Sequence, residues 1–184
     1  MQKFGFGTKW IGWLQACRSS AKFSVLKNGS PEGYFSSSRG LRQGDPLSPL
    51  LFTLVAEVLT QCFIRAQEAT LINGFQVENG RDKIPVLQYA DDTLVFLDAK
   101  TDEVGYLKSL LLWFELASGL QINVQKTTVF NVNESPTWED IREVWNCKAG
   151  TFPDIYLGAP LAASFKSKTV WQPLLEALRE RLAI

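Results

Sequence analysis

Residues 88–96 read QYADDTLVF and place two aspartates, Asp91 and Asp92, inside an otherwise apolar run. Aromatic and β-branched residues on both sides predict two strands, and the short break between them predicts a hairpin over 84–97. Tight hairpins favour Asn-Gly or Asp-Gly at the turn, because both central residues need positive φ. Two adjacent like charges do not meet this preference. The pair is therefore either a solvated acidic turn or a site where a cation neutralises the charge.

The flanking sequence alternates between helical and strand-like patterns without the spacing of βαβ units. Helices are expected at 9–20, with Thr8 as its cap, and at 46–68, 101–118, 137–146 and 167–182. Strand-like segments are expected at 21–27, 33–37, 74–77, 84–97, 120–130 and 152–161, and a turn at 78–82. The helix at 46–68 is apolar on nearly every face, so it is expected to be buried. This order predicts an α+β fold in which helices cover one face of an antiparallel sheet, with the turn at 91–92 on its rim.

The composition is that of one globular domain of 184 residues, with 46% apolar and 21% charged residues. Nineteen basic and nineteen acidic residues cancel, so binding of a polyanion would need a local site, a metal or further segments. The absence of histidine excludes Ser-His-Asp and Cys-His catalysis. The three dispersed cysteines argue against a disulfide framework or a zinc site, and they fit a reducing compartment.

No membrane association is expected from the sequence. Residues 1–16 lack the continuous apolar stretch of a signal peptide, and the most apolar segment, 46–59, is too short to span a bilayer. We therefore expect a soluble protein.

A second candidate site is the segment RGLRQGDPLSP at 39–49. Its arginines, glutamine and glycines precede a helix, where free backbone N–H groups and the helix dipole favour phosphate or sugar binding. A loop whose glycines only satisfy backbone geometry is the equal alternative. Paired carboxylates elsewhere favour the phosphate interpretation, because Mg²⁺ binds oxygen ligands together with substrate phosphates. Two such ions, roughly 3.5–4 Å apart, can activate an attacking hydroxyl and stabilise a leaving oxygen.

The ordered motifs RGLRQGDPLSPLLF, YADDTLVF, SGLQINVQKT and YLGAPL resemble reverse transcriptases of LINE-type non-LTR retrotransposons, plant ones in particular. The similarity covers essentially the whole chain. It implies a partial polymerase palm with an RRM- or ferredoxin-like core. It further implies that 1–163 is a partial fingers and palm domain and that 164–184 begins the thumb helix. The family is intracellular, in the nucleus or the cytoplasm.

The resemblance also implies roles for matching residues. Asp91 would be a direct ligand of two catalytic Mg²⁺ or Mn²⁺ ions, with Asp92 as an assisting carboxylate. Lys126 would protonate the leaving pyrophosphate, and a solvated lysine on a strand is the equal alternative. The implied nucleotide- and template-binding positions are Arg42, Gln43, Gly44, Tyr89 and Ala90, and the implied primer grip is Tyr156, Leu157 and Gly158. The complete enzyme acts on an RNA template, a DNA primer and a dNTP.

The chain departs from the family at one position of the catalytic site. Palm polymerases need a third carboxylate from a strand encoded before the glutamine-glycine motif, yet Glu32 is the only carboxylate in residues 1–44. The first palm strand, most of the fingers and the thumb are expected to come from a parent polyprotein. The isolated chain is therefore expected to be inactive in DNA synthesis, and an open strand edge predicts poor solubility.

Three other functions remain open from the sequence. The chain could be a non-catalytic module that binds RNA or a protein, a relic with no function, or a two-metal nuclease. Its zero net charge weakens the RNA-binding alternative, because such affinity depends on Lys and Arg. The nuclease alternative leaves the donor-rich loop at 39–49 and the segment at 156–158 unexplained.

Overall fold

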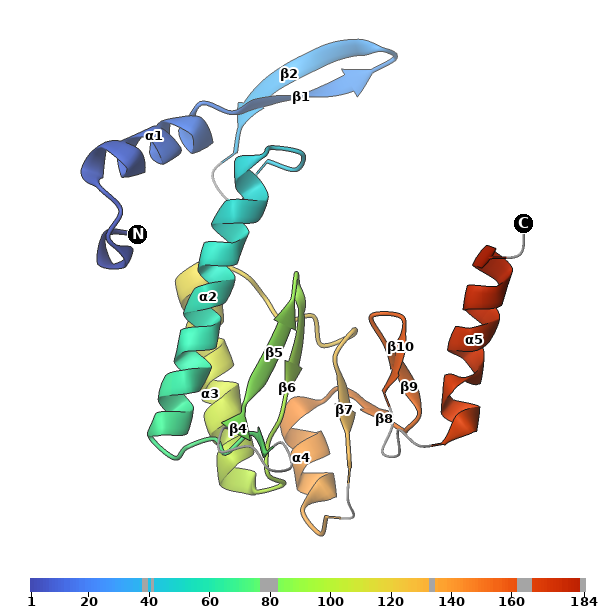
Figure 1. Ribbon diagram of the computed structural model, residues 1–184. Helices are drawn as coiled ribbons and strands as arrows, with labels where there is room; N and C mark the ends of the chain where they lie inside the picture. The colour runs from blue at the N-terminus through green and yellow to red at the C-terminus, as the bar shows by residue number, and fades with distance from the viewer. Residues whose placement is uncertain (38–39, 41, 77–82, 133–134, 162–166, 183–184) are drawn as a thin grey trace. The chain divides into compact units, whose positions relative to one another are not determined.

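The computed structural model describes residues 1–37, 40, 42–76, 83–132, 135–161 and 167–182 (Figure 1). The chain forms two compact units, unit 1 from Met1 to Glu57 and unit 2 from Val58 to Ile184, and each is described by itself. The helices are η1 (Gln2–Phe4), α1 (Thr8–Ser19), α2 (Leu47–Glu68), α3 (Thr101–Ser118), α4 (Trp138–Trp145) and α5 (Lys168–Leu182). The strands are β1 (Lys22–Lys27), β2 (Ser30–Ser36), β3 (Phe75–Gln76), β4 (Lys83–Ile84), β5 (Val86–Tyr89), β6 (Asp92–Val95), β7 (Thr128–Phe130), β8 (Lys148–Gly150), β9 (Asp154–Tyr156) and β10 (Ala159–Leu161).

The α+β class predicted from the sequence is confirmed, but the strands do not form one sheet. Those described pair as five two-stranded ladders: β1–β2, β3–β4, β5–β6 and β9–β10 are antiparallel, and β7–β8 is parallel. The predicted turn at 78–82 and the predicted domain boundary at 163/164 lie outside the described residues.

Unit 1 contains η1, α1, the β1–β2 hairpin and the first turns of α2. The hairpin turns at Asn28 and Gly29, whose φ angles of 51° and 82° are those that an Asn-Gly turn favours. The strand β2 therefore begins at Ser30, earlier than the predicted 33, because the turn needs only two residues. The register shifts between Ser24 and Val25, where the ladder has an irregularity.

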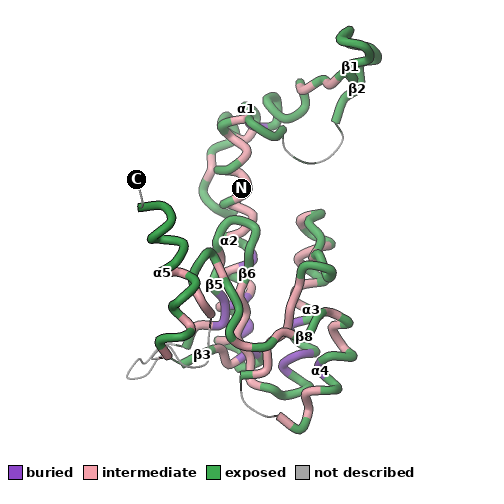
Figure 2. The backbone as a smooth tube through the Cα atoms, turned by 90° about the vertical axis from the view of Figure 1, so that its right-hand side faces the viewer, coloured by how far each residue is buried: buried purple, intermediate pink, exposed green. Residues whose placement is uncertain are grey.

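The core of unit 2 lies between α2, α3 and one face of the β5–β6 hairpin. Its buried residues are Leu59, Phe63, Ala66, Ile72, Val86 and Leu107. Figure 2 shows these buried segments gathered where α2, β6 and α3 approach one another. Side chains of a strand point alternately to opposite faces, so Val86 is buried while Leu87 is 47% exposed. The helices thus cover one face of this hairpin, as predicted.

The prediction that the helix at 46–68 is buried is wrong for most of its length. Only Leu59, Phe63 and Ala66 of α2 are buried, whereas Leu50 is 64% exposed. The described core packs only against the last three turns of α2, so the apolar side chains of the earlier turns are not buried. As a whole, α2 has 22 residues and is apolar enough to cross a membrane by length and composition, so the sequence argument from 46–59 alone was too narrow. The contacts of its second half with the unit 2 core are those of a core helix.

The segment 120–130, predicted as one strand, is a strand only at Thr128–Phe130. The backbone N–H groups of Lys126 and Thr127 both donate to the Asn123 carbonyl at 3.0 Å, and Lys126 also donates to the Asn123 side chain at 3.2 Å. Asn competes for backbone hydrogen bonds in this way and favours turns over ladders. The local turn therefore replaces the first two thirds of the predicted strand.

Candidate active site

The β5–β6 hairpin holds the two aspartates at its tip. Tyr89 pairs with Asp92, so the loop consists of Ala90 and Asp91 alone. The predicted Asp91–Asp92 turn is therefore shifted by one residue, and Asp92 is the first residue of β6. Ala90 has a φ of 52°, a conformation that costs an L-residue roughly 1–2 kcal/mol. The remainder of the hairpin stabilises this backbone.

The hairpin is fixed on α2 and along its own base. The Thr60 hydroxyl of α2 donates to the Gln88 side-chain oxygen at 2.6 Å. At the other end, the Phe96 N–H donates to the Pro85 carbonyl at 3.0 Å, one step beyond the β5–β6 ladder. Val86 and Val95, which face each other in the register, contact the core of unit 2. The tip thus extends from a packed base, while Asp91 and Asp92 are exposed.

These two carboxylates are the candidate metal ligands. Neither forms an ion pair with any residue that the structure describes, so their charges are not neutralised by a described Lys or Arg. Within the described ranges no cluster of three or more His, Cys, Asp or Glu is positioned to hold a metal ion. The oxygen donors are of the type that Mg²⁺ prefers. The donor set therefore fits a divalent metal in part, with two carboxylates present.

A second hairpin brings Tyr156 near Asp92. Tyr156 pairs with Ala159, and the two residues between them, Leu157 and Gly158, have φ angles of 53° and 80°. Positive φ at both central residues is the pattern of a type I′ turn. Burial, and to a lesser degree the negative charge of Asp92, raise the pKa of the Tyr156 hydroxyl above its ordinary value. A tyrosine hydroxyl is protonated at neutral pH even at its ordinary pKa, so the Tyr156 phenol is available as a hydrogen-bond donor.

The other predicted site residues come from other segments of the chain. Lys126 is exposed and lies in a turn after α3, not on the predicted strand, and it forms no ion pair with a described residue. Arg42, Gln43 and Gly44 belong to unit 1, where they are exposed just before α2. Asp45 caps that helix, since its Oδ1 accepts the Leu47 N–H at 2.8 Å. The structure therefore groups Tyr89, Ala90, Asp91, Asp92 and Tyr156.

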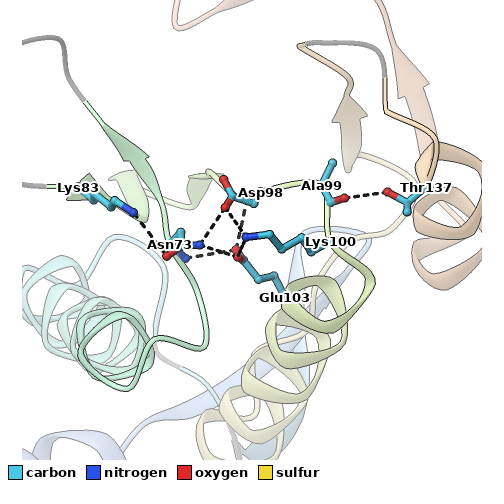
Figure 3. Close-up of polar contacts among 7 residues, drawn as sticks. All are labelled: Asn73, Lys83, Asp98, Ala99, Lys100, Glu103 and Thr137. Atoms are coloured by element: carbon cyan, nitrogen blue, oxygen red, sulfur yellow. Dashed lines mark hydrogen bonds and ion pairs between the residues drawn. The ribbon is translucent and has the colours of Figure 1, made fainter.

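Sequence reasoning missed a polar network that holds the connection after β6 (Figure 3). The Asn73 Nδ2 donates to Asp98 Oδ2 and to Glu103 Oε1, each at 2.8 Å. Glu103 is 6% exposed, and its Oε2 also accepts the backbone N–H of Asn73 at 3.2 Å and that of Asp98 at 3.3 Å. Lys100 forms ion pairs with Asp98 at 2.8 Å and with Glu103 at 3.5 Å. Hydrogen bonds from Lys100 and then from Asn73 lower the pKa of Asp98 below its ordinary value.

This network joins segments that are far apart in the sequence. Asn73 follows α2, Asp98 follows β6, and Glu103 lies in the first turn of α3. Nearby, the Thr137 hydroxyl donates to the Ala99 carbonyl at 2.7 Å and connects the start of α4 (Figure 3). The only signal in the sequence was the acidic pair Asp102 and Glu103 at the start of α3. That pair does not reveal Asn73 as the partner.

Comparisons with known proteins agree with the motifs. The family described as "Reverse transcriptase (RNA-dependent DNA polymerase)" matches residues 1–161. An uncharacterized mitochondrial protein of Arabidopsis thaliana is 53% identical over 66 residues, which are 36% of this chain and 54% of that protein. The "Retrovirus-related Pol polyprotein from type-1 retrotransposable element R2" of Popillia japonica is 35% identical over 97 residues, 53% of this chain and 13% of the polyprotein.

The longest of these alignments covers nearly the whole chain. The "Retrovirus-related Pol polyprotein from type-2 retrotransposable element R2DM" of Drosophila melanogaster is 23% identical over 174 residues, 95% of this chain and 15% of the polyprotein. The chain thus spans about half of the Arabidopsis protein and a small part of each Pol polyprotein. The predicted resemblance to reverse transcriptases of non-LTR elements is confirmed. The chain therefore belongs to the reverse transcriptase (RNA-dependent DNA polymerase) family.

Proposed function

We propose that the chain is the palm segment of a retrotransposon reverse transcriptase, and that the parent enzyme transfers nucleotides from dNTPs to a primer 3′-OH on an RNA template. The observation that carries this proposal is the β5–β6 tip, where Asp91 and Asp92 are exposed, form no ion pair with a described residue, and project from a base packed on α2 and α3. We further propose that 1–163 is fingers and palm and that 164–184 begins the thumb.

The carboxylates define the chemistry of this proposal. Asp91 and Asp92 would hold two Mg²⁺ or Mn²⁺ ions, which activate the primer hydroxyl and stabilise the leaving oxygen when bound. Tyr89 and Ala90 shape the turn on either side of these ligands. The protonated Tyr156 donates a hydrogen bond to the primer strand, with Leu157 and Gly158 forming the turn of that grip.

The remaining residues act on the nucleotide and the template. Arg42, Gln43 and Gly44 bind the nucleotide and template through donors next to the start of α2. Lys126 protonates the leaving pyrophosphate, for which its exposed ammonium is free among the described residues.

In this proposal the isolated chain is inactive, because residues 1–44 contain no aspartate that could serve as the third carboxylate ligand. Two divalent ions carry a charge of +4, and Asp91 with Asp92 offsets half of it. Phosphoryl transfer depends almost entirely on positioning and charge stabilisation, so loss of one ligand removes most of the rate. The missing aspartate would come from the parent polyprotein, whose relatives are several times longer than this chain.

Two measurements on the isolated chain test the proposal. Primer extension on an RNA template with dNTPs and Mg²⁺ or Mn²⁺ should give no template-dependent product; synthesis that Asp91→Asn abolishes would disprove the inactivity.

Titration of free Mn²⁺ by its electron paramagnetic resonance signal should detect weak binding that Asp91→Asn removes. The control Asp102→Asn, an exposed acid of α3, should keep it. Equal loss in both variants would argue against metal binding at the tip.

A further inference from the structure

The helix α3 has a second apolar side besides the one that packs in the core of unit 2. Its core side includes the buried Val104 and Leu107. Six exposed residues on another side form a stripe, which we name the outer stripe: Tyr106, Ser109, Leu112, Trp113, Leu116 and Ala117. Because positions three and four apart are neighbours on a helix, this stripe is continuous. Trp113 is 73% and Leu116 is 72% exposed, so no described segment covers its centre.

The composition of α3 indicates what kind of partner fits the outer stripe. No charged side chain belongs to the stripe, whereas nucleic-acid binding depends on Lys and Arg. Helices that lie on membranes carry Lys and Arg along their polar face. In contrast, α3 contains three acids and a single lysine, Lys108, whose ammonium donates to the Val144 carbonyl at 2.8 Å. The outer stripe therefore fits an apolar protein surface.

The outer stripe is complementary to itself. Its two small residues, Ser109 and Ala117, lie four positions before and four positions after Trp113. If two copies of α3 run antiparallel about a twofold axis at Trp113, Ser109 of one copy is level with Ala117 of the other. Small side chains at these contacts let the two helix axes approach and leave room for the indole rings. The Ser109 hydroxyl already donates to the Gly105 carbonyl at 2.9 Å, so its burial leaves no donor unsatisfied.

The area of the outer stripe is sufficient for a weak dimer. Its large residues Tyr106, Leu112, Trp113 and Leu116 are 46%, 54%, 73% and 72% exposed. At roughly 150–250 Å² for a fully exposed aromatic residue and somewhat less for leucine, they offer on the order of 500 Å² per copy. A pair would thus bury about 1,000 Å², the size of a weak but specific interface.

We infer that the chain forms an isologous dimer through the outer stripe, with the two α3 helices antiparallel about Trp113. The partner is therefore a second copy of this chain. This inference does not depend on the proposed function, because it uses neither the metal ligands nor the nucleotide-binding residues.

Sedimentation velocity of the full chain tests the dimer. Between about 1 and 100 µM, the chain should show a monomer–dimer equilibrium with a micromolar Kd. Leu116→Glu places a charge in the interface and should raise Kd at least about tenfold. The matched control Leu26→Glu changes a leucine of β1 that is 71% exposed, and it should alter Kd less than about threefold. A monomer at every concentration, or equal effects of the two variants, would overturn the inference.

Two further variants test the orientation of the helices. Mild oxidation of a mixture of Ser109→Cys and Ala117→Cys chains should give a dimer with a disulfide between positions 109 and 117, identified by peptide mass mapping. Each variant alone should link to itself far less, because its two cysteines would lie about 12 Å apart along the helix axes. Self-linked dimers in equal yield would contradict the antiparallel arrangement. This readout also supports the interface if Leu116→Glu fails to fold.

Salt distinguishes the outer stripe from an electrostatic association between copies. Unit 1 contains seven basic and three acidic residues, a net charge of +4, and unit 2 contains twelve basic and sixteen acidic residues, a net charge of −4. Association through these opposite charges would weaken from about 0.05 to 0.5 M NaCl, because salt screens exposed charges. The apolar dimer should keep its Kd within about threefold over this range. A rise in Kd above about tenfold with salt would overturn the apolar interface.

Discussion

The polar network behind β6 gives a stability prediction that can be worked from its contacts. Asn73→Ala removes both Nδ2 hydrogen bonds of 2.8 Å, one to Asp98 and one to Glu103. A hydrogen bond to a charged group contributes about 1.5–3 kcal/mol, and a buried acceptor that loses its partner adds a desolvation cost. Asp98 is half-exposed, so water can replace its lost partner, whereas Glu103 is buried.

The expected loss is therefore about 2–3 kcal/mol in the free energy of unfolding, most of it from Glu103. In the variant, Glu103 still accepts hydrogen bonds from the backbone N–H groups of Asn73 and Asp98. Because the carboxylate keeps these two donors, the loss of unfolding free energy should not exceed about 3 kcal/mol. Urea unfolding followed by tryptophan fluorescence measures this loss, with Trp145 packed against the core as one reporter. An unchanged m value would show that the unfolded state is the same.

Lys83→Ala is the matched control for Asn73→Ala. Its exposed ammonium lies 3.5 Å from Asn73 Oδ1 in the same network, so its removal should cost no more than about 0.5 kcal/mol. A loss below about 1 kcal/mol for Asn73→Ala, or equal losses for the two variants, would refute the reasoning.

Three further predictions concern the core, a glycine and pH. Phe63→Ala should cost about 3–5 kcal/mol by denaturant titration, because Phe63 is fully buried in the unit 2 core; a cost near that of an exposed residue would contradict this core. Gly74→Ala should destabilise more than Gly158→Ala in the same titration. Both have positive φ, but only at Gly74 would the new Cβ meet backbone atoms of Ile84 and Pro85, at 2.8 Å; equal effects would disprove the clash. The lowered pKa of Asp98 stabilises the folded state above the unfolded value of 3.8, and this contribution disappears as pH falls through the folded pKa. The stability difference between the natural chain and Asp98→Asn should therefore shrink below about pH 4 in acid titrations, and a constant difference would contradict this.

The sequence predicted elements whose signals are local. The helix at 101–118 ends at Gly119, which adopts the left-handed conformation with a φ of 76°, as a glycine after a helix favours. Likewise, the hairpin around 90–91 followed from alternating apolar residues on both sides of a short break. Capping and turn chemistry act within a few residues, so one sequence is enough to reveal them.

Burial and long-range contacts were harder to predict. The apolar pattern of α2 did not show which half packs in the core, because burial depends on partners such as Val86 and Leu107 from distant segments. The approach of Tyr156 to Asp92 likewise joins positions 64 residues apart, and no local spacing encodes it. The neutrality of the whole chain likewise concealed that unit 1 carries a net charge of +4 and unit 2 a net charge of −4.

The most direct test of the central claim is primer extension by the chain with the missing carboxylate restored. The chain is extended at its N-terminus with the corresponding upstream segment of a related Pol polyprotein and compared with its Asp91→Asn variant and with the unextended chain. We predict RNA-templated synthesis only by the extended chain, reduced at least about 100-fold by Asp91→Asn. Synthesis by the extended chain that survives Asp91→Asn would contradict the assignment of the β5–β6 tip as the metal-binding part of a polymerase.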